Sequence, residues 1–270
     1  MNLAYFLKDN RLELDPRVLG LLAELGAAGF EVYPVRCRED VRESTDMLLS
    51  FGGDGTFLSA AALAVEASLP ILGVNFGRLG FLSENKPEDV ADALVRRDFS
   101  FQRRGMVRVE GLSGGDGPQL ALNEICFLRK GAAMLGVDVE VDSRPLPTYW
   151  ADGLLVATSS GSTAYSLSAG GPICLPESKV LIISPIAPHN LNVRPLVVPD
   201  SAVIRVSFRS RDESIRLTAD NRGYDVPASS VLTVNAVPGA ISRVVLGGSN
   251  FIGALKSRLM WGGDLRNHTE

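Results

Sequence analysis

The run Gly52-Gly53-Asp54-Gly55-Thr56 has the residue types and the spacing of a phosphate-binding turn. It directly follows an apolar stretch and precedes an Ala/Leu-rich one, as in a strand–turn–helix unit. Glycines let the backbone turn tightly and approach a ligand closely, and the amides that open the following helix favour an anion. Because a carboxylate is unusual in such a turn, we expect Asp54 either to hold Mg²⁺ or to accept a proton from a hydroxyl near the phosphate.

This turn does not match the two best-known phosphate loops. No Lys follows its glycines, as GxxxxGK[ST] requires, and Leu58 stands where GxGxxG needs its last glycine. A purely structural alternative is that Asp54 caps the helix.

Two further polar segments are suited to binding a ligand. Asn123-Glu124 lies inside the apolar run 120–128. Adjacent strand residues face opposite sides, so one of the pair is expected to be buried or to face a cleft, unless a bulge turns both towards a ligand such as a ribose diol. Residues 152–171 (DGLLVATSSGSTAYSLSAGG) carry hydroxyls, amides and one aromatic ring, with no formal charge after Asp152. Such a surface suits a base and a sugar.

The elements that must position these residues change character along the chain. The first hundred residues alternate between short apolar runs and helical periods, which predicts a parallel sheet covered by helices. Strands are expected at 3–7, 30–35, 46–51 and 70–75, and helices at 17–29, 56–68 and 87–97. The Asp54 turn then lies beyond the carboxyl end of a strand, where open α/β sheets bind ligands.

Short β-branched runs separated by turn residues follow from about residue 100, which predicts an antiparallel sandwich or a pair of packed sheets. The last segment, 250–261, again has helical spacing. We therefore expect an α/β domain of residues 1–100 plus about 250–270, to which the C-terminal helix returns, and a β-rich domain of residues 101–249. Strands of the second domain are expected at 106–111, 120–128, 137–141, 154–158, 180–185, 202–210, 214–219 and 231–236.

Composition excludes several classes of protein. The 270 residues are 46% hydrophobic and 21% charged, which excludes a disordered or fibrous chain. A net charge of −4 lacks the electrostatic footprint of a general nucleic-acid binder. We find no signal peptide, and no stretch suited to about 20 residues in lipid. The three cysteines show no metal spacing and fit a reducing compartment. We therefore expect a cytoplasmic protein with neither nucleic acid nor membrane as a partner.

Taken together, the three polar segments resemble the NAD kinase family, which phosphorylates NAD to NADP. The resemblance spans essentially the whole chain, and Ala187-Pro188-His189 and Asp220 look like later motifs of the family. GGDGT alone is shared with lipid kinases and phosphofructokinases, so the long segment from Asp152 is the discriminating feature. The resemblance implies an N-terminal α/β domain, a C-terminal β-rich domain and a cleft between them that binds NAD.

Residue roles follow from the resemblance by position. Asp54 corresponds to the family's general base, and the residues of its turn, Gly52, Gly53, Gly55 and Thr56, to the phosphate-binding turn. Asn123 and Glu124 match the pair that binds the adenosine part of NAD. The other positions that match dinucleotide contacts are Asp152, Ser160, Thr163, Ala164, Tyr165, Ser168 and Ala187. Mg²⁺ is expected as the cation, without assigned ligands. The substrates implied are NAD and ATP, another nucleoside triphosphate or polyphosphate, and the chain is expected to form a homodimer or homotetramer.

Two positions depart from the family pattern. Trp150 stands where many members have Arg, and its ring can stack on or wall the site but cannot supply a guanidinium. A DGQ-like motif is replaced by Asp220-Asn221-Arg222, in which Asn221 is expected to adopt the positive φ of the missing glycine. Two alternative functions stay open: a lipid kinase of the diacylglycerol or sphingosine type, and a dinucleotide sensor without catalysis.

Overall fold

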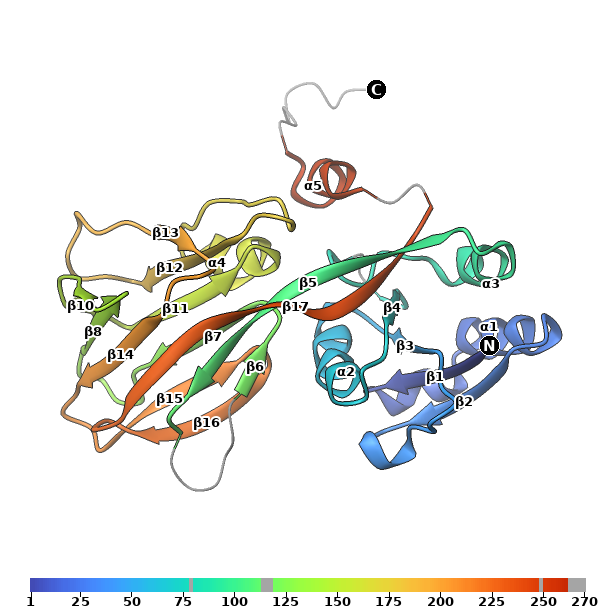
Figure 1. The fold of residues 1–270 in the computed structure, drawn as a ribbon, viewed down its shortest axis with the longest axis horizontal. Helices are drawn as coiled ribbons and strands as arrows, with labels where there is room; N and C mark the ends of the chain where they lie inside the picture. The colour runs from blue at the N-terminus through green and yellow to red at the C-terminus, as the bar shows by residue number, and fades with distance from the viewer. Residues whose placement is uncertain (78–79, 113–118, 248–249, 262–270) are drawn as a thin grey trace. The chain divides into compact units, whose positions relative to one another are not determined.

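The structure, a computed structural model, describes residues 1–77, 80–112, 119–247 and 250–261. The chain divides into two compact units, Met1–Arg103 with Ile241–Glu270 (unit 1) and Arg104–Ala240 (unit 2). Unit 1 combines helices with a parallel sheet, and unit 2 is rich in β-structure (Figure 1). The predicted fold class is therefore confirmed, and the C-terminal helix α5 (Phe251–Leu259) belongs to unit 1, as expected. The domain limits at residues 100 and 249 stay a prediction.

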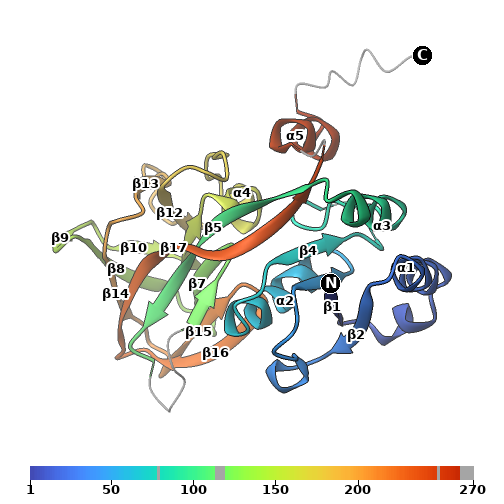
Figure 2. The same ribbon diagram turned by 45° about the vertical axis from the view of Figure 1, so that its right-hand side comes forward.

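The sheet of unit 1 places the candidate phosphate turn. Its strands run in the order β4-β3-β1-β2, all parallel, and the end of β17 joins the sheet by pairing Arg243 with Ile71 of β4. Side chains that alternate along the strands bury a core against α1 and α3, which lie side by side (Figure 2). The elements are β1 (Asn2–Leu7), α1 (Pro16–Ala27), β2 (Glu31–Val35), β3 (Met47–Phe51), α2 (Asp54–Glu66), β4 (Ile71–Val74) and α3 (Pro87–Arg96), with short 3₁₀ helices at Asn10–Leu14 and Arg38–Asp40.

Helix α2 covers the other face of this sheet. Leu72 and Val74 face the core shared with α1 and α3, so Gly73 between them faces the opposite side. A Cβ at Gly73 would lie 2.9 Å from the Phe57 ring of α2 and 2.7 Å from the carbonyl of Leu82. The glycine therefore lets both α2 and the segment around residue 82 lie directly on β4.

Unit 2 consists of two antiparallel sheets that share one core. One sheet contains β8, β10, β14 and the first half of β17, and the other has the order β13-β12-β11-β7-β15-β16. Inward-facing side chains of both sheets form a single apolar cluster, including Val137, Val156 and Val206. The strands are β5 (Phe99–Glu110), β6 (Gln119–Ala121), β7 (Glu124–Leu128), β8 (Leu135–Val141), β9 (Arg144–Pro145), β10 (Tyr149–Ala151), β11 (Gly153–Thr158), β12 (Val180–Ile186), β13 (Leu196–Pro199), β14 (Ile204–Arg209), β15 (Ser214–Ala219), β16 (Arg222–Pro227) and β17 (Val231–Leu246), with a 3₁₀ turn at Ser160–Thr163 and α4 at Tyr165–Ser168.

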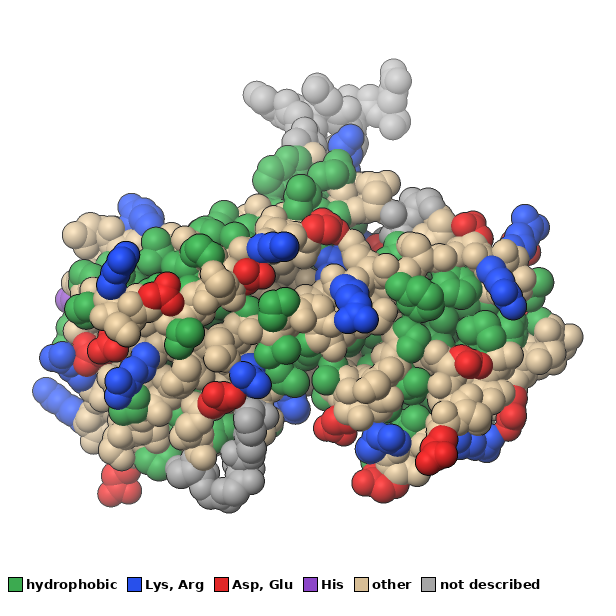
Figure 3. Space-filling view, viewed as in Figure 1, with side chains coloured by type: hydrophobic (Ala, Val, Ile, Leu, Met, Phe, Trp, Pro, Cys, Tyr) green, Lys and Arg blue, Asp and Glu red, His purple; other side chains and the backbone are tan. Residues whose placement is uncertain are grey.

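On the face drawn in Figure 3, acidic and basic side chains are interspersed rather than gathered by sign. No helix among the described residues is long and apolar enough to cross a membrane.

Candidate active site

The glycine turn after β3 is built as the sequence predicts. Gly52 has φ +153°, and a Cβ on it would lie 2.4 Å from the Thr56 hydroxyl oxygen, so this position requires glycine. Its amide donates to the carbonyl of Val74 at 3.0 Å, which ties the turn to the end of β4. Beyond the turn and its own helix, no atom of the described residues lies within 4 Å of a Cβ built on Gly53 or Gly55. The turn thus opens at the carboxyl ends of β3 and β4, beside the first turn of α2.

The carboxylate of Asp54 is oriented by three backbone amides from a neighbouring segment. Its Oδ2 accepts from Phe81 N at 2.8 Å, and its Oδ1 accepts from Leu82 N at 3.0 Å and Ser83 N at 2.9 Å. The N-cap of α2 is Gly53, and the bonds that the Asp54 carboxylate makes within the described chain go to this segment, which gives the capping alternative no support. A carboxylate oxygen has two lone pairs, and Oδ2 uses one of them on Phe81. The side chain is therefore held in one orientation and keeps an acceptor site.

Gly80 makes this arrangement sterically possible. A Cβ there would lie 1.9 Å from Asp54 Oδ1 and 2.3 Å from its carboxyl carbon. The sequence prediction did not include Gly80 or the amides of residues 81–83. A signal was present, because a second Asn- and Gly-containing turn, beginning Asn75-Phe76-Gly77, follows the next parallel strand, β4.

In unit 2, Asn123 and Glu124 lie at a break between β6 and β7, and both are buried. The Asp220 carboxylate holds this break open by accepting three consecutive amides. Its Oδ2 accepts from Leu122 N at 2.7 Å, and its Oδ1 accepts from Asn123 N at 2.8 Å and Glu124 N at 3.2 Å. The strand expected over residues 120–128 is therefore interrupted at this pair, and both side chains are buried rather than one of them.

Glu124 is an unusual buried acid. Burial raises its pKa to about 8, the Asp220 carboxylate adds to the rise, and the amide of Tyr165 opposes it. Its Oε2 has no hydrogen-bond partner within the described chain. Burial also raises the pKa of Asp220, against the three amides it binds. Because a buried carboxyl without partners is costly, Glu124 is suited to receiving a hydrogen bond from, or giving one to, a ligand.

The Ser/Gly segment packs onto this pair. The Thr158 hydroxyl donates to Leu122 O at 2.6 Å and accepts from Gly161 N at 3.0 Å. A Cβ on Gly161 would lie 2.2 Å from the carbonyl oxygen of Asn123, so only glycine fits here. Residues 158–165 are thereby fixed against the break that carries Asn123 and Glu124.

Tyr165 is the first residue of α4 and is 40% exposed. Burial raises the pKa of the Tyr165 phenol, and Cys126, Asp152 and Glu124 each add to the rise. Asp152 itself pairs with Arg129 at 2.6 Å.

Ala187 follows β12 in a left-handed conformation, with φ +46°. The preceding carbonyl, of Ile186, accepts from Asp152 N at 3.0 Å, so Ala187 lies beside Asp152. A non-glycine residue in this region is strained, and such strain gathers at functional sites.

The structure therefore places the predicted residues in two groups, one in each unit. Unit 1 holds the residues of the turn, Gly52, Gly53, Asp54, Gly55 and Thr56. Unit 2 holds the others. Asn123 and Glu124 lie at the break, Ser160, Thr163, Ala164, Tyr165 and Ser168 lie in the 3₁₀ turn and α4 that follow β11, and Asp152 and Ala187 lie at the opposite end of β11.

The structure shows the two positions that depart from the family pattern, the turn at Asp220-Asn221 and Trp150. The positive φ expected at Asn221 occurs at Asp220, with φ +51°, so that expectation is wrong. The conformation turns the Asp220 carboxylate onto its three amides. The Trp150 ring lies on Gly136 of β8, where a Cβ would meet it at 2.9 Å. Since Tyr149 and Ala151 face the core, Trp150 lies on the outer face of β10.

Comparison with known proteins assigns the chain to a family. The ATP-NAD kinase N-terminal domain matches residues 18–97, and the ATP-NAD kinase C-terminal domain matches residues 122–245. The NAD kinase of Flavobacterium psychrophilum is 35% identical, with 97% of this chain and 92% of that protein covered. The NAD kinase of Porphyromonas gingivalis strain W83 is 38% identical over 87% of this chain and 84% of that protein. The chain belongs to the NAD kinase family.

Solved structures agree with this assignment. An NAD kinase from Archaeoglobus fulgidus in complex with ATP has a TM-score of 0.76 and 29% identity, covering 95% of this chain and 99% of that one. Yeast NADH kinase complexed with NADH has a TM-score of 0.83 at 22% identity, covering 99% of this chain and 90% of that one, and shows the shared fold. The predicted family is confirmed, and the lipid-kinase alternative has no support from these matches.

Proposed function

We propose that this chain transfers the γ-phosphate of ATP, or of another phosphoryl donor, to the 2′-hydroxyl of the adenosine ribose of NAD, giving NADP. The observation that carries the proposal is the Asp54 carboxylate. In a chain of the NAD kinase family, it stands in a glycine turn at the carboxyl ends of two parallel strands, with one acceptor site left on Oδ2. Phosphoryl transfer to an alcohol needs an acceptor for the hydroxyl proton, and this site supplies one.

Unit 1 supplies the phosphate-binding part of the proposal. The turn residues Gly52, Gly53, Gly55 and Thr56 bind the donor phosphates, supported by the N-terminus of α2. The open space beside Gly53 and Gly55 lets phosphate oxygens approach the backbone.

The residues present fit Mg²⁺ only as a cation carried by the donor phosphates. Among the described residues no group of three or more His, Cys, Asp or Glu side chains could enclose a metal ion. Mg²⁺ in phosphoryl-transfer sites typically keeps several waters and binds substrate phosphates with one or two carboxylates. Mg²⁺ bound by the donor phosphates and water would neutralise charge on the transferring phosphate, and the acceptor site on Asp54 Oδ2 is left for the proton.

Unit 2 supplies the dinucleotide-binding part of the proposal. Asn123 and Glu124 bind the adenosine portion through the buried amide and carboxyl, and the exposed ring of Tyr165 offers a stacking surface. The remaining contacts with NAD are assigned to Asp152, Ser160, Thr163, Ala164, Ser168 and Ala187.

The proton is proposed to pass to Asp54 Oδ2 as the bond to phosphorus forms. The three amides contribute by fixing the direction of the carboxylate, because correct orientation removes part of the entropic barrier.

The experiment that tests the proposal measures NADP formation by purified protein with Mg²⁺, NAD and a panel of donors: ATP, other nucleoside triphosphates and polyphosphate. We expect Asp54→Asn to lower kcat by about 10²–10⁴-fold, the usual contribution of general base catalysis, while NAD binding measured by calorimetry survives. Asp92→Asn is the matched control, since Asp92 is exposed and, within the part of the chain that the structure describes, pairs with Arg96 alone. Undiminished turnover by Asp54→Asn would remove Asp54 from this role, and NAD binding without any NADP would favour the sensor alternative.

The proposal also includes the location of the protein and its oligomeric state. All three cysteines are free thiols, which supports a cytoplasmic location. A homodimer or homotetramer is proposed from the family resemblance, and light scattering coupled to size-exclusion chromatography tests it.

A further inference from the structure

The segment Phe81–Glu84 is held from two directions. From α2, Asp54 binds the amides of residues 81–83. Two arginines hold the same segment through other groups. Arg243 of β17 donates through Nη2 to the carbonyl of Leu82 at 3.2 Å and to Glu84 Oε1, and Arg258 of α5 pairs with Glu84 Oε2 at 3.4 Å. The segment whose amides orient Asp54 is thus itself fixed by guanidinium groups.

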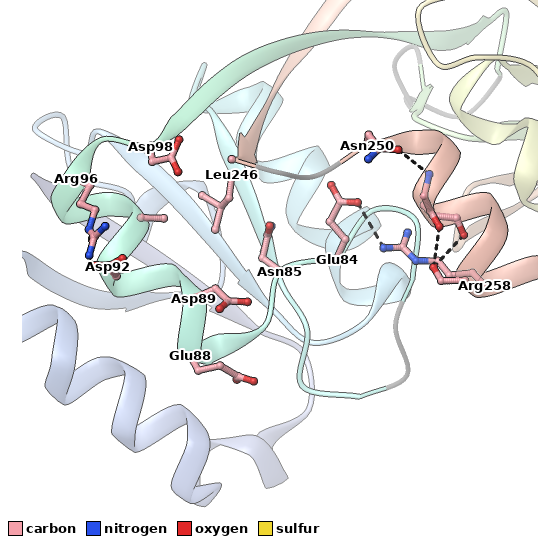
Figure 4. Close-up of a pocket in the computed structure, with 15 residues that line it drawn as sticks. Glu84, Asn85, Glu88, Asp89, Asp92, Arg96, Asp98, Leu246, Asn250 and Arg258 are labelled. Carbon is pink, nitrogen blue, oxygen red and sulfur yellow. Dashed lines mark hydrogen bonds and ion pairs between the residues drawn. The ribbon is translucent and has the colours of Figure 1, made fainter. Parts of the chain in front are cut away.

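Arg258 makes a second contact with this segment. Its guanidinium carbon lies 5.1 Å from the centre of the Phe81 ring, and Phe251 at the start of α5 lies 6.0 Å from the same ring. Figure 4 shows Glu84 and Arg258 pointing toward each other from the segment before α3 and from α5. Arg258 therefore contacts the side chains of the first and last residues of the segment, Phe81 and Glu84.

The arrangement is costly as a stabilising device. The side chains of Glu84, Arg243 and Arg258 are only 10%, 7% and 9% exposed. Nε of Arg243, and Nε and Nη1 of Arg258, are buried without hydrogen-bond partners within the described chain. Buried ion networks rarely stabilise a fold better than apolar side chains of similar volume. A role other than stability gives such a network a reason to be present.

The charges also link Arg258 to Asp54. Burial lowers the pKa of Arg258, and the carboxylates of Glu84 and Asp54 oppose that shift. The network therefore comprises two carboxylates and two guanidinium groups, and Asp54 is its member nearest the glycine turn.

We propose that Arg258, acting with Arg243 through Glu84 and Leu82, is a positioning residue for Asp54. This inference rests on the proposed function, because it assigns Arg258 a role in aiming the base. The guanidinium groups hold Phe81–Glu84 at the place where its three amides set the direction of the Asp54 carboxylate. Arg258 touches neither NAD nor the donor in this proposal, and acts only through the segment.

The test compares Arg258→Met, which keeps the length of the side chain and removes the guanidinium, with Arg258→Lys, which keeps the charge. Lys256→Met is the matched control, because Lys256 is exposed on the same helix. For Arg258→Met we expect kcat to fall by about 10- to 100-fold with the KM values for NAD and ATP within about twofold, since a displacement of about 1 Å costs on the order of 10²-fold. We expect Arg258→Lys to recover part of this loss and Lys256→Met to match the wild-type protein.

A structural readout independent of turnover accompanies the kinetics. Hydrogen–deuterium exchange of the peptide that contains residues 80–84 should accelerate in Arg258→Met, because the segment loses a guanidinium anchor and its amides separate more often from the Asp54 carboxylate. In the Asp54→Asn background, Arg258→Met should cause no further loss of kcat. An equal loss in both backgrounds, or unchanged kcat and unchanged exchange, would overturn the positioning role. Retained turnover by Asp54→Asn alone would instead refute the proposed base, so the two failures are distinguishable. Should Arg258→Met not fold, Arg258→Lys carries the same comparisons.

Discussion

The steric relation between Gly80 and Asp54 yields a prediction that a single methyl group can test. A Cβ at residue 80 would lie 1.9 Å from Asp54 Oδ1 and 2.6 Å from Oδ2. Ordinary contact begins at 3.4 Å, so the carboxylate of a Gly80→Ala variant must retreat by about 1.5 Å. The φ of Gly80 is not in the left-handed region, and alanine therefore meets no backbone penalty.

The expected consequence is loss of catalysis in a folded protein. The carboxylate sits at the end of a side chain, so it moves more easily than the backbone of residue 80. Displacement of this size breaks bonds to the amides of Leu82 and Ser83 and turns Oδ2 from its position. Misplacement of a reacting group by about 1 Å costs on the order of 10²-fold, so we expect kcat to fall by about 10²-fold or more. The melting temperature should change by only a few degrees, because these bonds lie at a half-buried site.

The assay is steady-state NADP formation, accompanied by thermal unfolding and by calorimetric titration with NAD. Gly77→Ala is the matched control, since no atom of the described residues lies within 4 Å of a Cβ at that position. Wild-type turnover by Gly80→Ala would refute the reasoning, and so would an equal loss in Gly77→Ala. A loss confined to Gly80→Ala, with NAD still bound, would support it.

Two predictions concern unit 2. Gly161→Ala should destabilise the protein by about 1–3 kcal/mol in urea unfolding and weaken NAD binding, because its Cβ would lie 2.2 Å from the backbone of Asn123. Gly20→Ala, in open space on α1, is the control and should not destabilise the protein. Glu124→Gln should flatten the pH dependence of stability. Because the pKa of Glu124 is raised from 4.5 to about 8, the folded chain binds more protons than the unfolded chain between these values, and its stability falls as pH rises through that window. Urea titrations at pH 5 and pH 8 should show a loss of a few kcal/mol in the wild-type protein that Glu124→Gln largely lacks, and parallel slopes in the two proteins would contradict the assignment.

The fold of unit 1 was accessible from sequence because its elements are local. Each predicted strand and helix agrees with the structure to within two residues, since apolar periodicity and flanking glycines or prolines report directly on such elements. The long strands were harder. β5 begins at Phe99 rather than 106, and β17 continues to Leu246 rather than 236. The polar run Gln102-Arg103-Arg104 and the pair Pro238-Gly239 interrupt their alternation, so the pattern suggested shorter strands.

The site was predictable to the extent that its residues are contiguous. The glycine turn stands out because strand, glycines and helix follow one another within a few residues. The partners of Asp54 lie 27 to 29 residues further on, and Arg258 follows more than 170 residues after Glu84. Their approach depends on the pairing of β3, β4 and β17, which a single sequence does not reveal. The same limit applies to Asp220, whose targets precede it by almost a hundred residues.

Asp54 and Asp220 bind backbone amides in the same way, although only Asp54 is proposed as a general base. Each accepts three consecutive amides, one on Oδ2 and two on Oδ1. A set of three amide hydrogen bonds is therefore a means of shaping a turn, and by itself it does not identify a general base. What distinguishes Asp54 is its place as the first residue of α2, behind glycines and at the carboxyl edge of a parallel sheet, where an anion is favoured. Asp220 instead shapes the break that carries Asn123 and Glu124, so under the proposed function one carboxylate serves the phosphate site and the other the dinucleotide site.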